Sequence, residues 1–172
     1  MHKKATGVYS DIIRINPRAF KMVKLAESRI NMGRLIYCQE MGNINGIVPW
    51  CVFFCSWCME HSGYDIKEFQ FPDSGNVGVW CDSLKKLGRF EVKEKYTPVQ
   101  GDLIIFGYGP YNRTHIGLVS RVVDGYVYTI EGNTNTAKGT VVKGTYNGVN
   151  TCLMKCRKLN DSYIYGYGKV AP

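Results

Sequence analysis

Cys51 and His115 are the two residues of this sequence best suited to nucleophilic chemistry. Cys51 follows Pro49 by two positions and opens the most apolar run of the chain, which predicts a helix buried on nearly every side. A thiol in the first turn of a helix lies at the positive end of the helix dipole, which favours the nucleophilic thiolate. Because cysteine is also a common core residue, Cys51 indicates catalysis only if a base and an orienting group lie nearby.

His115 begins an expected strand, and the hairpin that follows brings polar side chains back toward it. The Asp-Gly pair at residues 124–125 is a strong hairpin signal. Pairing across that turn places His115 opposite the neighbourhood of residues 132–133. Glu131 and Asn133 are two positions apart on the return strand, so both side chains point to one face and either could hold the imidazole. We favour Glu131 as the direct partner, since a carboxylate stabilises an imidazolium, with Asn133 as an auxiliary group.

A zinc site is the competing interpretation of the cysteine-rich helix. Cys51, Cys55, Cys58 and His61 are possible ligands by type, but all would lie on one short helix with bulky apolar residues between them. Structural zinc sites usually draw their ligands from two separated pairs. We therefore expect no metal and no cofactor, and His61 is interpreted as a surface or capping group. The chain has seven cysteines, an odd number, so at least one thiol stays free unless it pairs between chains.

The apolar patterning predicts helices first and antiparallel strands second, which is an α+β order. Helices are expected over residues 18–32, from Cys51 to a C-cap at Gly63, and over residues 79–87. Strands are expected at residues 90–92, 103–106, 115–123, 126–133, 141–146 and 163–168. This order would pack N-terminal helices on a C-terminal antiparallel sheet. We interpret residues 1–172 as one catalytic domain, with residues 1–17 as an N-terminal extension.

The composition narrows the classes of partner. The net charge of +8 would suit an anionic polymer, but the basic residues are spread along the chain and form no dense arm, so no nucleic acid is expected as a partner. No stretch is long and apolar enough to span a membrane, and the N-terminus lacks the apolar core of a secretory signal peptide. We expect a protein made in the cytoplasm without such a signal, or a part of a larger protein.

Several motifs, in one order, resemble those of CHAP domains, the cysteine- and histidine-dependent amidohydrolases and peptidases. WCVFFCSWC at residues 50–58 resembles their nucleophile motif, and PVQGDLIIF at residues 98–106 resembles their P-x-x-G-D strand. HIGLV at residues 115–119 resembles the histidine strand, and TIEGNTN at residues 129–135 resembles the strand with the acid and the asparagine. The similarity extends to the family's closing strand, which IYGYG at residues 164–168 resembles.

The resemblance implies a papain-like fold and hydrolysis of an amide bond in peptidoglycan. Its catalytic residues would be Cys51, His115, Glu131 and Asn133. The activity would be that of an N-acetylmuramoyl-L-alanine amidase or of a stem or cross-bridge endopeptidase, as in phage or prophage lysins that act at the bacterial cell wall. The sequence does not choose between these bonds. We expect the protein to be a monomer.

The sequence departs from the family pattern at two places and leaves two other functions open. Thr114 stands where the family often has an acidic residue, and residues 41–48 lack the aspartates of a calcium loop, so no calcium is expected. One alternative is a non-catalytic wall-binding or phage tail component on the same fold, although the complete set of site residues argues against it. The other is a cysteine-peptidase toxin that acts on protein, which no feature of the sequence excludes.

Overall fold

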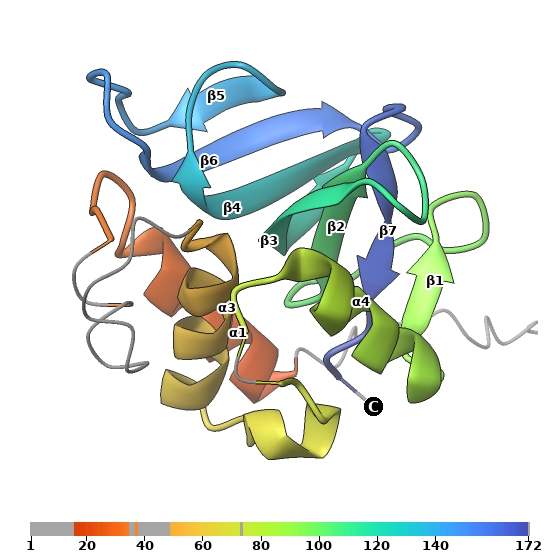
Figure 1. The fold of residues 1–172 in the computed structure, drawn as a ribbon. Helices are drawn as coiled ribbons and strands as arrows, with labels where there is room; N and C mark the ends of the chain where they lie inside the picture. Colours follow the sequence, from red (N-terminus) through yellow and green to blue (C-terminus); the bar gives the residue numbers. More distant parts are fainter. Residues whose placement is uncertain (1–15, 35–36, 38–48, 73, 172) are drawn as a thin grey trace, which may run out of the picture.

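The computed structural model describes residues 16–34, 37, 49–72 and 74–171, and its helices precede its strands (Figure 1). The helical elements are α1 (Pro17–Glu27), α3 (Cys51–His61), the 3-10 helix η1 (Ile66–Phe69) and α4 (Val77–Lys86). This order confirms the α+β class and its N-terminal helical part. The expected N-terminal extension and the segment examined for a calcium loop, residues 41–48, lie outside the described residues except for positions 16 and 17.

The strands form one antiparallel sheet in the order β1-β7-β2-β3-β4-β6-β5. They are β1 (Phe90–Val92), β2 (Leu103–Gly107), β3 (Arg113–Val123), β4 (Tyr126–Thr134), β5 (Thr140–Lys143), β6 (Thr151–Lys158) and β7 (Ile164–Gly168). Six of these strands were expected from the sequence, within a few residues at their ends. Strand β6 was not, and it pairs with β4 near the centre of the candidate site.

The hairpin of β3 and β4 has the expected turn and nearly the expected register. Val123 pairs with Tyr126 beside the turn, and Leu118 pairs with Ile130 farther along. A bulge around Ser120 shifts the register by one residue between these pairs. The start of β3 therefore lies close to the end of β4, where the sequence places His115 and the polar residues.

The first helix is shorter than the sequence predicts. α1 ends at Glu27, so the expected extension to residue 32 is wrong. Ser28 caps the helix, and Asn31 has a left-handed backbone with φ of 72°. The N–H of Asn31 donates to the carbonyl of Cys152 at 2.9 Å. The chain thus leaves the helix because its backbone hydrogen-bonds the sheet instead.

Each face of the sheet carries an apolar cluster, as strand alternation requires. Leu103 and Ile105 of β2 pack with α1, α3 and α4 in the larger cluster. Ile104 and Phe106, which alternate with them, belong to a smaller cluster on the other face. In Figure 1 the helices lie together on one side of the curved sheet. None of the helices in the described part is long and apolar enough to span a membrane.

Candidate active site

The first turn of α3 carries Cys51 and has an unusual N-terminus. Trp50 precedes the helix and makes no side-chain hydrogen bond to its backbone, whereas Asn16, Asp65 and Asn76 cap the other helical elements. The first N–H groups of a helix have no partner within the helix itself. The start of α3 therefore offers backbone donors beside the thiol, in a place that suits an anionic oxygen.

Two glycines allow the elements of the site to approach one another. A Cβ at Gly132 would lie 2.6 Å from the Cβ of Phe54 and 2.8 Å from the ring of Trp50, so glycine lets α3 pack directly on β4. A Cβ at Gly117 of β3 would lie 2.9 Å from the Cγ of Glu131. Larger residues at these positions would displace the helix of the thiol or the acidic side chain.

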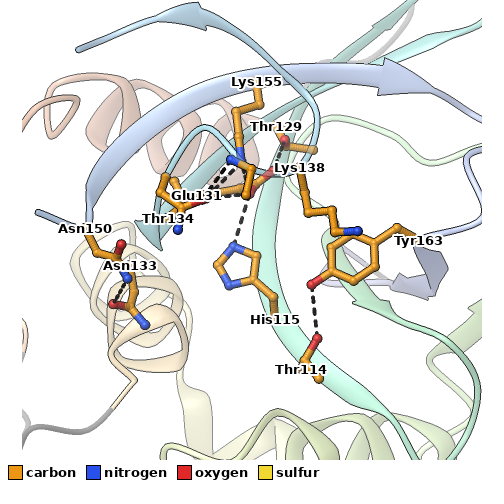
Figure 2. A network of polar contacts seen from close by, with 12 residues as sticks. Thr114, His115, Thr129, Glu131, Asn133, Thr134, Lys138, Asn150, Lys155 and Tyr163 are labelled. Atoms are coloured by element: carbon orange, nitrogen blue, oxygen red, sulfur yellow. Dashed lines mark hydrogen bonds and ion pairs between the residues drawn. The ribbon is translucent and has the colours of Figure 1, made fainter. Parts of the chain in front are cut away.

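His115 lies between the thiol and the acid. Its ring stacks on that of Phe106, its partner in β2, with centroids 5.6 Å apart. Its Nε2 is 3.1 Å from Oε2 of Glu131 (Figure 2), and Cys51 is hydrogen-bonded to the same ring. Because Nε2 faces the carboxylate, Nδ1 is left for the thiol. Burial opposes protonation of the ring, but the hydrogen bonds with Cys51 and Glu131 outweigh it and raise the pKa of His115 to about 9.

The carboxylate of Glu131 is enclosed and saturated with donors, since only 1% of its side chain is exposed. Its Oε1 accepts hydrogen bonds from Arg157 Nη1 and Thr129 Oγ1, both at 2.7 Å. Its Oε2 accepts from Thr134 Oγ1 at 3.2 Å and lies 3.7 Å from Lys155 Nζ. Burial alone would raise the pKa of Glu131, but Arg157 and the other cations around it hold that pKa well below its usual range. The carboxylate therefore stays ionised, and the positions of both oxygens are fixed.

Sequence reasoning missed Lys155 and Arg157, the two cations of this network. Both lie on β6, where Lys155 pairs with Thr129 of β4, so their side chains share a face with Glu131. Alternating cations in a strand usually indicate a solvated face, yet Lys155 is 1% exposed and Arg157 is 4% exposed. The one signal in the sequence is that these cations alternate with apolar residues in a segment rich in cysteine, leucine and methionine.

Asn133 lies at the border of the site, and its side chain contacts Asn150, whereas that of Glu131 contacts His115. Its backbone is left-handed, with φ of 55°, a conformation that asparagine tolerates better than most residues. Its Oδ1 accepts a hydrogen bond from Asn150 Nδ2 at 3.2 Å, and Figure 2 shows the pair to one side of His115. The imidazole thus contacts the carboxylate of Glu131, the partner favoured from the sequence.

The site opens into a cleft of about 320 Å³. Its lining includes Pro49, His115, Glu131, Asn133, Lys138 and Tyr163. A second hollow of about 520 Å³ has Pro49 and Asn133 in common with the cleft and is also lined by Arg34 and Val149. The two hollows therefore adjoin each other at Pro49 and Asn133.

The other thiols have surroundings unlike that of Cys51. Burial raises the pKa of Cys55 and Cys58 well above the usual value, and it raises the pKa of Cys152 to about 12. All six cysteines of the described residues are free thiols. Within that part of the chain, no group of three or more histidine, cysteine or acidic side chains could hold a metal ion. His61 Nδ1 lies 2.9 Å from the carbonyl of Trp57 at the end of α3, as suits a capping group.

The geometry joins a thiol, an imidazole and a carboxylate in a row, the set that attacks carbonyl carbons in hydrolases. The family model of the CHAP domain matches residues 43–133, just over half of the chain. That range contains all four residues singled out from the sequence: Cys51, His115, Glu131 and Asn133. Comparisons with curated proteins and with solved structures gave no match. The chain belongs to the CHAP domain family of cysteine- and histidine-dependent amidohydrolases and peptidases.

Proposed function

We propose that this protein is a peptidoglycan hydrolase that cleaves an amide bond with Cys51 as its nucleophile. One observation carries the proposal: the thiol of Cys51 is hydrogen-bonded to His115, and Nε2 of that ring contacts the buried carboxylate of Glu131. A thiol, a base and an orienting group in contact are the diagnostic arrangement of a covalent hydrolase. Membership of the CHAP family supports the same class of reaction.

In the first half of the reaction, the Cys51 thiolate forms a bond to the carbonyl carbon of the scissile amide. The carbonyl oxygen becomes an oxyanion, and the backbone N–H groups at the start of α3 stabilise it. His115, as an imidazolium, then donates its proton to the amide nitrogen, and the carbon–nitrogen bond breaks. The amine leaves, and an acyl-enzyme thioester remains on Cys51.

In the second half, His115 accepts a proton from a water molecule. The resulting hydroxide attacks the thioester carbon, and Cys51 leaves as a thiolate. Glu131 orients the imidazole throughout and stabilises its charged form, and Asn133 assists from the border of the cleft. This division of roles, together with the helix-on-sheet arrangement, supports a papain-like type of active site.

The proposed substrate is the amide bond between the lactyl group and L-alanine, or a bond of the stem or cross-bridge peptide. The net charge of +8 suits an anionic cell wall. The cleft and the adjoining hollow would accommodate groups on both sides of the scissile bond. We propose further that the chain acts as a monomer and as a single catalytic domain at the bacterial cell wall, in the manner of a phage or prophage lysin.

Digestion of purified peptidoglycan, with the products identified by mass spectrometry, tests this proposal. The matched control is the Cys51→Ala variant. The wild-type protein should release fragments with a new amino terminus, and the variant should release none. A new terminus on the first stem residue identifies an amidase, and one elsewhere in the peptide identifies an endopeptidase. Binding without cleavage would favour a wall-binding component, and cleavage of protein substrates alone would favour a toxin.

A further inference from the structure

The cleft beside His115 has more positive than negative charge. Among the described residues that line it, the charged side chains other than His115 are Glu131, Lys138 and Lys155. The oxygens of Glu131 are already occupied by the donors described above, with Arg157 on Oε1. Arg157 already balances the charge of Glu131, so Lys155, which also lies 3.7 Å from that carboxylate, and Lys138 leave the lining with an excess of positive charge.

Lys138 is held at the rim of the cleft by two tyrosines. Its Nζ donates to the hydroxyl of Tyr108 at 2.8 Å and lies 5.3 Å from the centroid of the Tyr163 ring. In Figure 2 the lysine extends across Tyr163, on the side of His115 opposite Asn133. An ammonium group has three N–H donors, and the hydroxyl of Tyr108 accepts from one of them. Lys138 therefore has donors left for a ligand.

Lys155 lies deeper in the same cleft. Its Nζ donates to Thr134 Oγ1 at 3.0 Å and is 3.7 Å from Oε2 of Glu131, a carboxylate that Arg157 already pairs. Burial lowers the pKa of Lys155, while Glu131 opposes that effect. A carboxylate brought near by a ligand would favour the charged ammonium further.

We propose that Lys138 and Lys155 form a subsite for a carboxylate of the substrate, on the Tyr163 side of the scissile amide. The inference rests on the proposed function and adds a substrate class to it: muropeptides with a free carboxylate near the bond that is cut. A neutral carboxamide in the same place would lose the attraction of both ammonium groups. The subsite thus selects acidic stem peptides over their amidated forms.

Binding to the Cys51→Ala variant tests the subsite without turnover. The probes are two muropeptides that differ only at one stem carboxyl, which is free in the first and amidated in the second. Isothermal titration calorimetry should show the free acid to bind about tenfold more tightly, as expected for charge-assisted hydrogen bonds. Raising the salt from about 0.05 M to about 0.5 M should reduce that preference.

Adding Lys138→Met to this variant should remove most of the preference for the free acid, because one of the two ammonium groups is lost. Lys138 is exposed, so its replacement should leave the fold intact. Lys158→Met is the matched control, since Lys158 is an exposed lysine of β6 that does not line the cleft. Lys155→Met, with its fold checked by circular dichroism, should lower the affinity for the acid more than the affinity for the amide.

Equal affinities for the two muropeptides, or a preference that survives Lys138→Met, would overturn the subsite. The proposed function would stand in that event if the wild-type protein still digested the wall. Absence of binding by both muropeptides, together with absence of digestion, would overturn the proposed function and the subsite at once.

Discussion

Helix α3 buries three thiols, Cys51, Cys55 and Cys58, in one apolar cluster, and the first differs from the other two in its polar partner. In the first turn, Cys51 is hydrogen-bonded to His115 at a helix N-terminus that has no side-chain cap. In the body of the helix, Cys55 and Cys58 are completely buried in the apolar cluster, and burial raises the pKa of both thiols. The place on the helix, rather than the residue type, therefore decides which thiol can act as a nucleophile.

Replacement of cysteine by alanine should have opposite consequences at the start and in the body of α3. Cys51→Ala should lower peptidoglycan hydrolysis at least about 1,000-fold, because the nucleophile is lost. The free energy of unfolding, measured by urea denaturation, should change little. Cys58→Ala should leave the activity of the folded protein near that of the wild type and lower the free energy of unfolding by about 1–2 kcal/mol, as lost core volume.

The comparison between the thiols would break down if Cys58→Ala, while still folded, lost hydrolysis and Cys51→Ala retained it. The nucleophile would then lie in the body of the helix, and the contact between Cys51 and His115 would be structural.

Glu131 and Asn133 are two residues apart on β4, and their substitutions should affect hydrolysis to very different extents. Glu131→Gln should reduce hydrolysis about 100-fold or more, because the imidazolium loses its carboxylate partner. It should also cost about 3–5 kcal/mol of stability, since Arg157 and Lys155 would lose the one carboxylate they face within the described residues. Asn133→Ala should reduce hydrolysis less than about tenfold, as expected for an auxiliary group. Kinetic assays and denaturant unfolding measure both effects.

A larger loss of activity in Asn133→Ala than in Glu131→Gln would reverse the assignment. Thr129→Val offers a milder control, because it removes one hydrogen bond to Oε1 of Glu131 and retains the shape of the side chain.

The pH dependence should follow the protonation of His115. Hydrolysis should fall on the alkaline side as the imidazolium loses its proton near its pKa of about 9. The pKa of a free histidine is about 6.5. His115 therefore stabilises the fold fully below that pH, and this contribution is lost as the pH rises through about 9. An alkaline limb close to pH 6.5 in the pH–rate profile would contradict the raised pKa.

Much of the site could be predicted because its signals are local in the sequence. The proline before Cys51 marks the start of the helix, and the turn at residues 124–125 fixes which residues of the hairpin meet. The chemistry of an imidazolium favours the carboxylate of Glu131, whereas the expected alternation fails at Asn133, whose left-handed backbone places it at the border of the site. Each of these inferences needs only neighbours along the chain or across one tight turn.

The support of the carboxylate could not be predicted, because it depends on a strand far along the chain. Lys155 and Arg157 resemble solvated residues until β6 is placed beside β4, which buries both. The early end of α1 has a similar origin, since Asn31 leaves the helix to hydrogen-bond the same strand. Local patterning does not show which segments lie beside β6, and both contacts depend on those neighbours.

The relative reactivity of the thiols tests the central claim most directly. Iodoacetamide at near-neutral pH, with each cysteine followed by mass spectrometry, gives a labelling rate for every thiol of the folded protein. We predict that Cys51 is labelled first, and that His115→Ala removes both this fast labelling and peptidoglycan hydrolysis. If Cys81 or Cys152 were labelled first while Cys51 stayed inert, Cys51 would be a core residue and the proposal of an enzyme would fail.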